Sequence, residues 1–228
     1  MSLKINKHVL VWSIITYLFV FQRALVGSIS IFNYMDELFA IIVGMSLVAK
    51  TLSKKVRLNA DETTVCWKLA MENVETPTAL IFSRQGIAKL PEGTDYEQAA
   101  KGAYIVAGSD ENPDVILVAS GSEVSTLEAG CEALRADGIK VRVVSAPSEG
   151  LFRGQSKEYQ ESVLPKNAKI FGMTAGLPVT LQGLVGANGK VWGMESFGFS
   201  APYKVLDEKL GYTGENVYKQ VKAFLAEA

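Results

Sequence analysis

The stretch "TALIFSRQG", Thr78 to Gly86, places an arginine directly after an apolar run. Four consecutive apolar residues are typical of a buried strand, and the glycine that follows is typical of a turn. The guanidinium of Arg84, beside the end of such a strand, could hold a phosphate through two parallel hydrogen bonds. The alternative is an ion pair with an acidic side chain, a commoner role for an arginine. The local pattern favours the ion pair and leaves the phosphate open.

A second polar group, "SGS" at Ser120 to Ser122, follows another apolar run and precedes a predicted helix. The beginning of a helix attracts anions because its first N–H groups lack partners. However, Ser120 and Glu123 have the S-x-x-E spacing of a capping box, in which the side chains satisfy those N–H groups. The sequence also has no G-x-G-x-x-G and no G-x-x-x-x-G-K-[ST]. Capping is the favoured interpretation.

Nucleophilic catalysis has little support in the sequence. A serine or cysteine nucleophile usually needs a histidine as base, and the only histidine, His8, lies in an apolar segment at the start of the chain. Cys66 and Cys131 are far apart, which excludes a disulfide framework and a zinc site of ordinary spacing. A formal net charge of −1 argues against a nucleic-acid surface. We therefore predict no catalytic, cofactor-binding or metal-binding residue.

The elements that position these residues follow an α/β pattern. The runs Ala103–Ala107 and Val115–Ala119 flank a turn-rich segment, which predicts a β-hairpin. The second run leads into a helix, and the next strand lies in "IKVRVVSAP". A strand, a helix and a strand with short connections predict a right-handed parallel βαβ unit. The buried face of the helix is marked by Val124, Leu127, Cys131 and Leu134.

The first quarter of the chain has a different composition. Two apolar runs, His8–Phe21 and Leu38–Ala49, are flanked by lysines at their outer ends. That charge placement is typical of a two-helix membrane hairpin with both ends in the cytoplasm, so residues 8–49 predict membrane association. The alternative is a pair of buried helices, because each run is shorter than the roughly 20 residues of a spanning helix.

Several motifs together resemble transketolase, specifically its C-terminal end. They include "PTALIFSRQGIAKLP", "ILVASGSEVS", "YQESVLP" and "AGLPVTLQGLVGANGKVWGMESFGFSAP". The resemblance covers about Arg57 to Ala228. It is specific, since S-R-Q after a strand, E-S-V-L-P and F-G-x-S-A-P do not occur together in pyruvate dehydrogenase β-type subunits or deoxyxylulose phosphate synthases.

The resemblance implies a fold and an activity. Transketolases are cytoplasmic homodimers that move a two-carbon ketol unit between sugar phosphates, with thiamine diphosphate and a divalent metal, Mg or Ca. The arginine of S-R-Q, here Arg84, would bind the sugar phosphate. The catalytic glutamate, the histidines and the metal-diphosphate motif have no counterpart in this chain. The resemblance therefore implies that this chain alone is inactive and binds no cofactor.

The implied organisation has four parts. Residues 1–56 form an apolar segment that resembles a polytopic membrane protein, and residues 57–91 are the remnant of a pyrimidine-binding domain. Residues 92–101 are a linker, and residues 102–228 are the C-terminal domain. The expected fold class is α/β, a three-layer αβα domain with a mostly parallel sheet and one antiparallel strand, preceded by apolar helices. Two alternatives remain: an assembly module that pairs with a separate N-terminal half, and a membrane-tethered chimeric protein.

Overall fold

The computed structural model describes residues 54–57, 62–82, 86–87, 89–108 and 112–227. Both predicted apolar runs lie outside these residues, so the predicted membrane hairpin stays a prediction. Among the described residues, no helix combines the length and the apolar character needed to cross a membrane. The chain divides into two compact units, one made of Val56–Leu69 with Leu80–Ala228 and the other of Met1–Lys55 with Ala70–Ala79.

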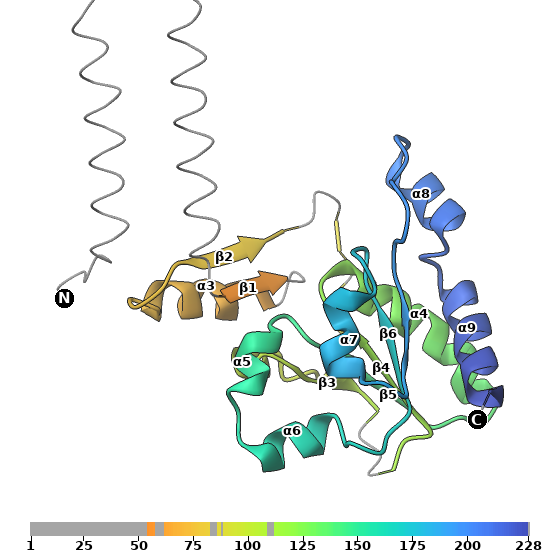
Figure 1. Cartoon of the computed structure of the whole chain (residues 1–228), viewed down its shortest axis with the longest axis horizontal. Helices are drawn as coiled ribbons and strands as arrows, with labels where there is room; N and C mark the ends of the chain where they lie inside the picture. The colour runs from red at the N-terminus through yellow and green to blue at the C-terminus, as the bar shows by residue number, and fades with distance from the viewer. Residues whose placement is uncertain (1–53, 58–61, 83–85, 88, 109–111, 228) are drawn as a thin grey trace, which may run out of the picture. The chain divides into compact units, whose positions relative to one another are not determined.

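The larger unit is built on a five-stranded sheet (Figure 1). The strand order is β3-β5-β4-β6-β7, and all neighbours are parallel except β3 and β5. The predicted mostly parallel sheet with one antiparallel strand is confirmed. The strands are β3 (Tyr104–Ala107), β4 (Val115–Ala119), β5 (Val141–Ser145), β6 (Ile170–Met173) and β7 (Lys190–Trp192).

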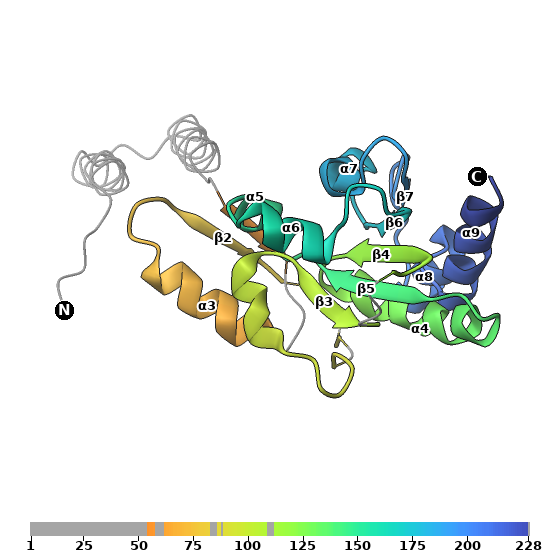
Figure 2. The same cartoon turned by 90° about the horizontal axis from the view of Figure 1, so that it is seen from below.

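Helices cover both faces of this sheet, as Figure 2 shows. One face carries α4 (Ser122–Ala136) and α9 (Gly214–Ala226), and the other carries α5 (Glu149–Arg153), α6 (Lys157–Val163) and α7 (Val179–Val185). A 3₁₀ helix, η1 (Tyr96–Lys101), precedes β3, and α8 (Tyr203–Leu210) lies between β7 and α9. The three-layer arrangement is therefore confirmed for the described residues.

The central strand β4 shows why this sheet needs two helical layers. All five of its residues are buried. Val115, Leu117 and Ala119 belong to the core under α4 and α9, whereas Ile116 and Val118 belong to the core under α5, α6 and α7. Successive side chains of a strand point to opposite faces, so a continuous apolar run is stable only when both faces are covered.

The predicted βαβ unit is confirmed, but the predicted hairpin is wrong. Strands β4 and β5 pair in parallel with α4 between them, and the four residues predicted for the buried face of α4 are buried. Strand β3 does not pair with β4. It pairs with β5, because β5 and β6 occupy both edges of β4, whereas the outer edge of β5 is open.

A shorter segment precedes this domain. It contains β1 (Lys54–Arg57), α3 (Glu62–Glu72) and β2 (Thr78–Ile81), and the two strands form their own two-stranded sheet. The turn between α3 and β2 is closed by Asn73, whose side-chain nitrogen donates to the Thr76 carbonyl and to the Thr78 hydroxyl, both at 2.7 Å. An isolated two-stranded sheet is at best marginally stable in water.

Candidate functional site

The candidate phosphate-binding residue, Arg84, lies outside the described residues. Strand β2 ends at Ile81, and the residues that the structure describes stop at Phe82 and begin again at Gly86. The predicted strand before the S-R-Q motif is thus present, but the prediction that it is buried is wrong, since Ile81 is 43% and Phe82 50% exposed. The role of Arg84 stays a prediction.

The predicted capping box at Ser120 is wrong. Helix α4 begins at Ser122, and its N-cap is Gly121, which makes no side-chain cap hydrogen bond. Gly121 has a φ of 67°, in the left-handed region that favours glycine. This turn places Ser120 one residue before the cap, where its hydroxyl cannot serve the first turn. Ser125 donates its hydroxyl hydrogen to the Ser122 carbonyl at 2.7 Å, which is a bond within the helix and not a cap.

The carboxyl ends of β4 and β6 are where an α/β sheet most often binds a ligand, because the connections there leave in opposite directions. In this chain the position beyond β6 is occupied by the protein's own groups. The Tyr212 hydroxyl donates to the Thr174 carbonyl at 2.8 Å, and the Gly176 N–H donates to the Thr174 hydroxyl at 3.1 Å. Burial raises the pKa of Tyr212 to about 12, so it remains a donor at neutral pH. These contacts stabilise the loops and leave no exposed polar group at Thr174, which is 1% exposed.

A buried carboxyl group lies at the same edge of the sheet. Glu62, in the first turn of α3, is completely buried. Its Oε1 accepts a hydrogen bond from the Tyr104 hydroxyl at 2.9 Å and another from the Ser145 hydroxyl at 2.5 Å. Tyr104 begins β3 and Ser145 ends β5, and the two residues are paired across the sheet. Glu62 therefore joins α3 to two strands of the C-terminal domain.

Sequence reasoning missed this cluster. Its members are 42 and 83 residues apart, and none of them stands in a recognisable motif. The available signal is the spacing of Glu62 and Cys66, four residues apart, which places both on one face of α3. Buried carboxyl groups are rare unless hydrogen-bonded, so the geometry indicates a structural joint.

The two cysteines are also buried, and their chemistry follows from that. Burial raises the pKa of Cys66 to about 12, and the neighbouring Glu62 carboxylate adds to the effect. Burial also raises the pKa of Cys131 to about 12, with a smaller contribution from Glu128. A thiol is nucleophilic only as the thiolate, so neither cysteine is a nucleophile at neutral pH.

A cavity of about 370 Å³ opens beside the N-terminal half of α4. Its charged lining residues are Lys89 and Glu128, which have opposite signs. Glu128 Oε1 accepts from Arg135 at 3.0 Å, while Oε2 has no hydrogen-bond partner. Opposite charges on an otherwise apolar lining select neither a cation nor an anion. Across the described ranges, no group of three or more His, Cys, Asp or Glu residues is arranged to hold a metal ion.

Comparison with known proteins identifies the domain. Residues 102–213 match the family described as the transketolase-like TK C-terminal domain. This stretch is therefore similar to the C-terminal domain of transketolases. They cover the five-stranded sheet and every helix of the larger unit from α4 to α8.

Individual transketolases agree with this assignment. Transketolase 2 of Vibrio parahaemolyticus is 44% identical over 167 residues, which are 72% of this chain and 25% of that protein. The transketolase structure from Leishmania mexicana superimposes with a TM-score of 0.71 at 31% identity, over 81% of this chain and 27% of that one. The transketolase structure from Pichia stipitis in complex with sedoheptulose-7-phosphate superimposes with a TM-score of 0.70 at 31% identity. This match covers 76% of this chain and 25% of that one.

The match to these transketolases covers about three quarters of the chain, which is more than the stretch from residue 102 to residue 228 contains. It therefore extends upstream of residue 102. The chain nevertheless spans only about a quarter of the length of the transketolases it matches. The described residues therefore correspond to the C-terminal part of a transketolase.

Proposed function

We propose that this chain supplies the C-terminal part of an enzyme that transfers a two-carbon ketol unit between sugar phosphates. The observation that carries the proposal is the match of residues 102–213 to the transketolase-type domain, together with a shared fold at a TM-score of 0.70 to 0.71. In this proposal residues 57–91 are the remnant of the pyrimidine-binding domain, residues 92–101 are a linker and residues 102–228 are the C-terminal domain.

The chemistry of ketol transfer would come from parts that this chain does not match. Complete enzymes of this kind use thiamine diphosphate and a divalent metal, which form and stabilise the carbanion. The chain's own contribution would be the S-R-Q segment, in the remnant of the pyrimidine-binding domain, and a folded C-terminal domain that contacts the rest of the enzyme.

We expect no ketol transfer from the isolated chain. The test is purified chain with thiamine diphosphate, Mg²⁺, xylulose 5-phosphate and ribose 5-phosphate, with an intact transketolase as the positive control. A ketol transfer needs a bound cofactor and an acid–base partner, and those groups are outside the matched quarter. Turnover above that of a heat-denatured sample would contradict the proposal.

Arg84 is proposed to bind the phosphate of the sugar substrate. The Pichia relative is described as a complex with sedoheptulose-7-phosphate, which supports a sugar phosphate as the ligand class. A guanidinium matches a phosphate bidentately, and such a contact is worth about 1.5–3 kcal/mol.

Arg84→Ala should therefore raise the KM for phosphorylated substrates about tenfold or more, when the chain is assembled with the missing domains. The KM for an unphosphorylated ketose should stay the same. Lys89→Ala is the control, because it removes an equal charge from the exposed side chain of a neighbouring residue. Equal effects of the two substitutions would argue against a specific phosphate contact.

A second candidate function is an assembly module that pairs with a separately encoded N-terminal half. It is favoured by apolar side chains that remain exposed in the segment before the domain. Trp67 and Phe82 stack with their ring centres 6.4 Å apart, yet each is about half exposed, as is Ile81. Homodimer formation and a membrane-tethered chimeric protein remain proposals that neither the described residues nor the comparisons test.

A further inference from the structure

An exposed apolar surface lies at the carboxyl end of β6 and β7. It is formed by the loop after β6, the first residue of α7, the loop after β7 and the first turn of α8. The six exposed side chains of this surface, here called the α8 face, are those of Leu177, Val179, Phe197, Phe199, Tyr203 and Val205. They are 47% to 98% exposed, and Phe197 is the most exposed of all at 98%.

The two loops of the α8 face are held together by the backbone. The Met194 N–H donates to the Gly176 carbonyl at 2.8 Å, which joins the loop after β7 to the loop after β6. The Lys209 ammonium lies 4.0 Å from the centre of the Phe199 ring, and this contact ties α8 to the same surface. These two contacts connect the loop after β7 to the loop after β6 and to α8.

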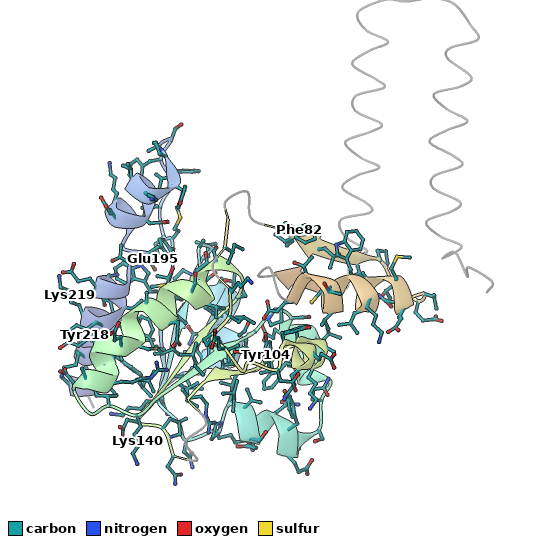
Figure 3. All side chains as sticks on the ribbon, turned by 180° about the vertical axis from the view of Figure 1, so that it is seen from behind. Phe82, Tyr104, Lys140, Glu195, Tyr218 and Lys219 are labelled. Atoms are coloured by element: carbon teal, nitrogen blue, oxygen red, sulfur yellow. The ribbon has the colours of Figure 1, made fainter. Side chains whose placement is uncertain are left out.

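Helix α8 has no buried residue at all. Figure 1 shows it standing off the end of the sheet, and Figure 3 shows Glu195, in the loop that leads to it, at the end of the domain opposite Lys140. The indole N–H of Trp192 donates to the Leu210 carbonyl at 3.3 Å and anchors only the last turn. Helices in proteins are stabilised mainly by packing an apolar face against other elements. Within the described residues, α8 lacks such a packing partner for most of its length.

The apolar area is large enough for a specific interface. Six side chains of this size expose on the order of 600 Å². A standard interface buries about 800 Å² on each partner, with aromatic residues enriched at its centre. The α8 face thus supplies most of the surface that one side of a stable contact requires.

We propose that the α8 face is the contact surface for the other domains of a transketolase, and this inference rests on the proposed function. The relatives contain about three times more chain than the part that matches here, since the match is 25% of their length. A second, separate apolar surface at Trp67, Ile81 and Phe82 is also uncovered. One symmetric contact between two copies of this chain would bury one patch on each copy, whereas a large multidomain partner can cover both.

The test is co-expression of this chain with the first three quarters of the Vibrio transketolase, so that neither part has to fold alone. We expect the tagged chain to co-purify with that partner. Phe197→Ser with Phe199→Ser should reduce the co-purified amount at least tenfold, because exposed aromatic anchors dominate such contacts. Tyr96→Ser is the matched control, since Tyr96 is 44% exposed and outside the α8 face, and it should co-purify normally.

The possible results separate the inference from the function on which it rests. If the wild-type chain does not co-purify, the proposed function fails and takes the inference with it. If the wild-type chain and the double variant co-purify equally, only the inference fails. Sedimentation of the full chain alone provides a second test. If the wild-type chain is a dimer and the double variant is a monomer, the α8 face binds a second copy of this chain and the inference is wrong.

A stability measurement completes the test. The double variant should unfold at the same urea concentration as the wild-type chain, because the two phenylalanines support no core in the described residues. A clear decrease in the urea midpoint would show that these side chains already have an apolar partner within the chain, and would overturn the inference.

Discussion

Replacing Glu62 with alanine is expected to lower the free energy of unfolding by about 3 kcal/mol. The carboxyl group is fully buried, and one of its oxygens accepts hydrogen bonds from both Tyr104 and Ser145. Alanine removes this acceptor from two buried hydroxyl groups and leaves a cavity between α3 and the sheet. Urea unfolding followed by circular dichroism measures the change.

Two further variants show whether the hydrogen bonds are the cause. Tyr104→Phe and Ser145→Ala each remove one donor, and each should cost about 1–2 kcal/mol. Combined with Glu62→Ala, either substitution should cost little more, because the bond is already lost. Glu132→Ala is the control on an exposed helix position and should change the stability by less than about 0.5 kcal/mol. If the losses of unfolding free energy from the three substitutions were fully additive, the three side chains would not form one hydrogen-bonded cluster.

Gly130→Leu is expected to destabilise the domain by about 3 kcal/mol, because it separates two helices that touch through glycine. A Cβ atom at residue 130 would lie 2.6 Å from Cγ1 of Val217 and 2.9 Å from the Gly214 carbonyl oxygen. Gly214 has the reciprocal restriction, since its Cβ would lie 2.8 Å from the Ala129 backbone. Backbone atoms cannot rotate away, so α9 would have to move off α4. Val217, Val221 and Phe224 would then lose part of their burial.

Gly150→Ala is the matched control for this prediction. Gly150 lies inside α5, where an added Cβ meets no atom within 4 Å. Alanine there should stabilise the protein by about 0.5–1 kcal/mol, since glycine loses more backbone entropy in a helix. If Gly130→Leu behaved like Gly150→Ala in thermal unfolding, the close crossing of α4 and α9 would be wrong.

The local elements of the domain could be predicted from its sequence. The run Val115–Ala119 and the spacing of Val124, Leu127, Cys131 and Leu134 predicted a buried strand and a one-sided helix, and both are present. The N-cap of α9 is equally local, because Thr213 accepts from the Asn216 N–H, three residues along the chain, at 3.3 Å. These features depend on residues a few positions apart, so the sequence contains them directly.

The candidate site was less predictable. The motif around Arg84 could be found, but the structure does not describe that residue and its role remains a proposal. The capping box at Ser120 was predicted from spacing alone, and the left-handed turn at Gly121 displaced it. The Glu62 cluster was not found, because a carboxyl group at a helix start is ordinarily solvated and its burial depends on strands far along the chain.

By itself, then, the sequence determined the class of fold, the order of its helices and strands, and the similarity of residues 102–213 to the C-terminal domain of transketolases. Tertiary structure decided which strand lies beside β5, which carboxyl group is buried and which aromatic residues stay exposed. The physical reason is that periodic patterns report burial within one element, whereas strand order and the pairing of Glu62 with Tyr104 and Ser145 depend on free sheet edges and contacts between distant residues.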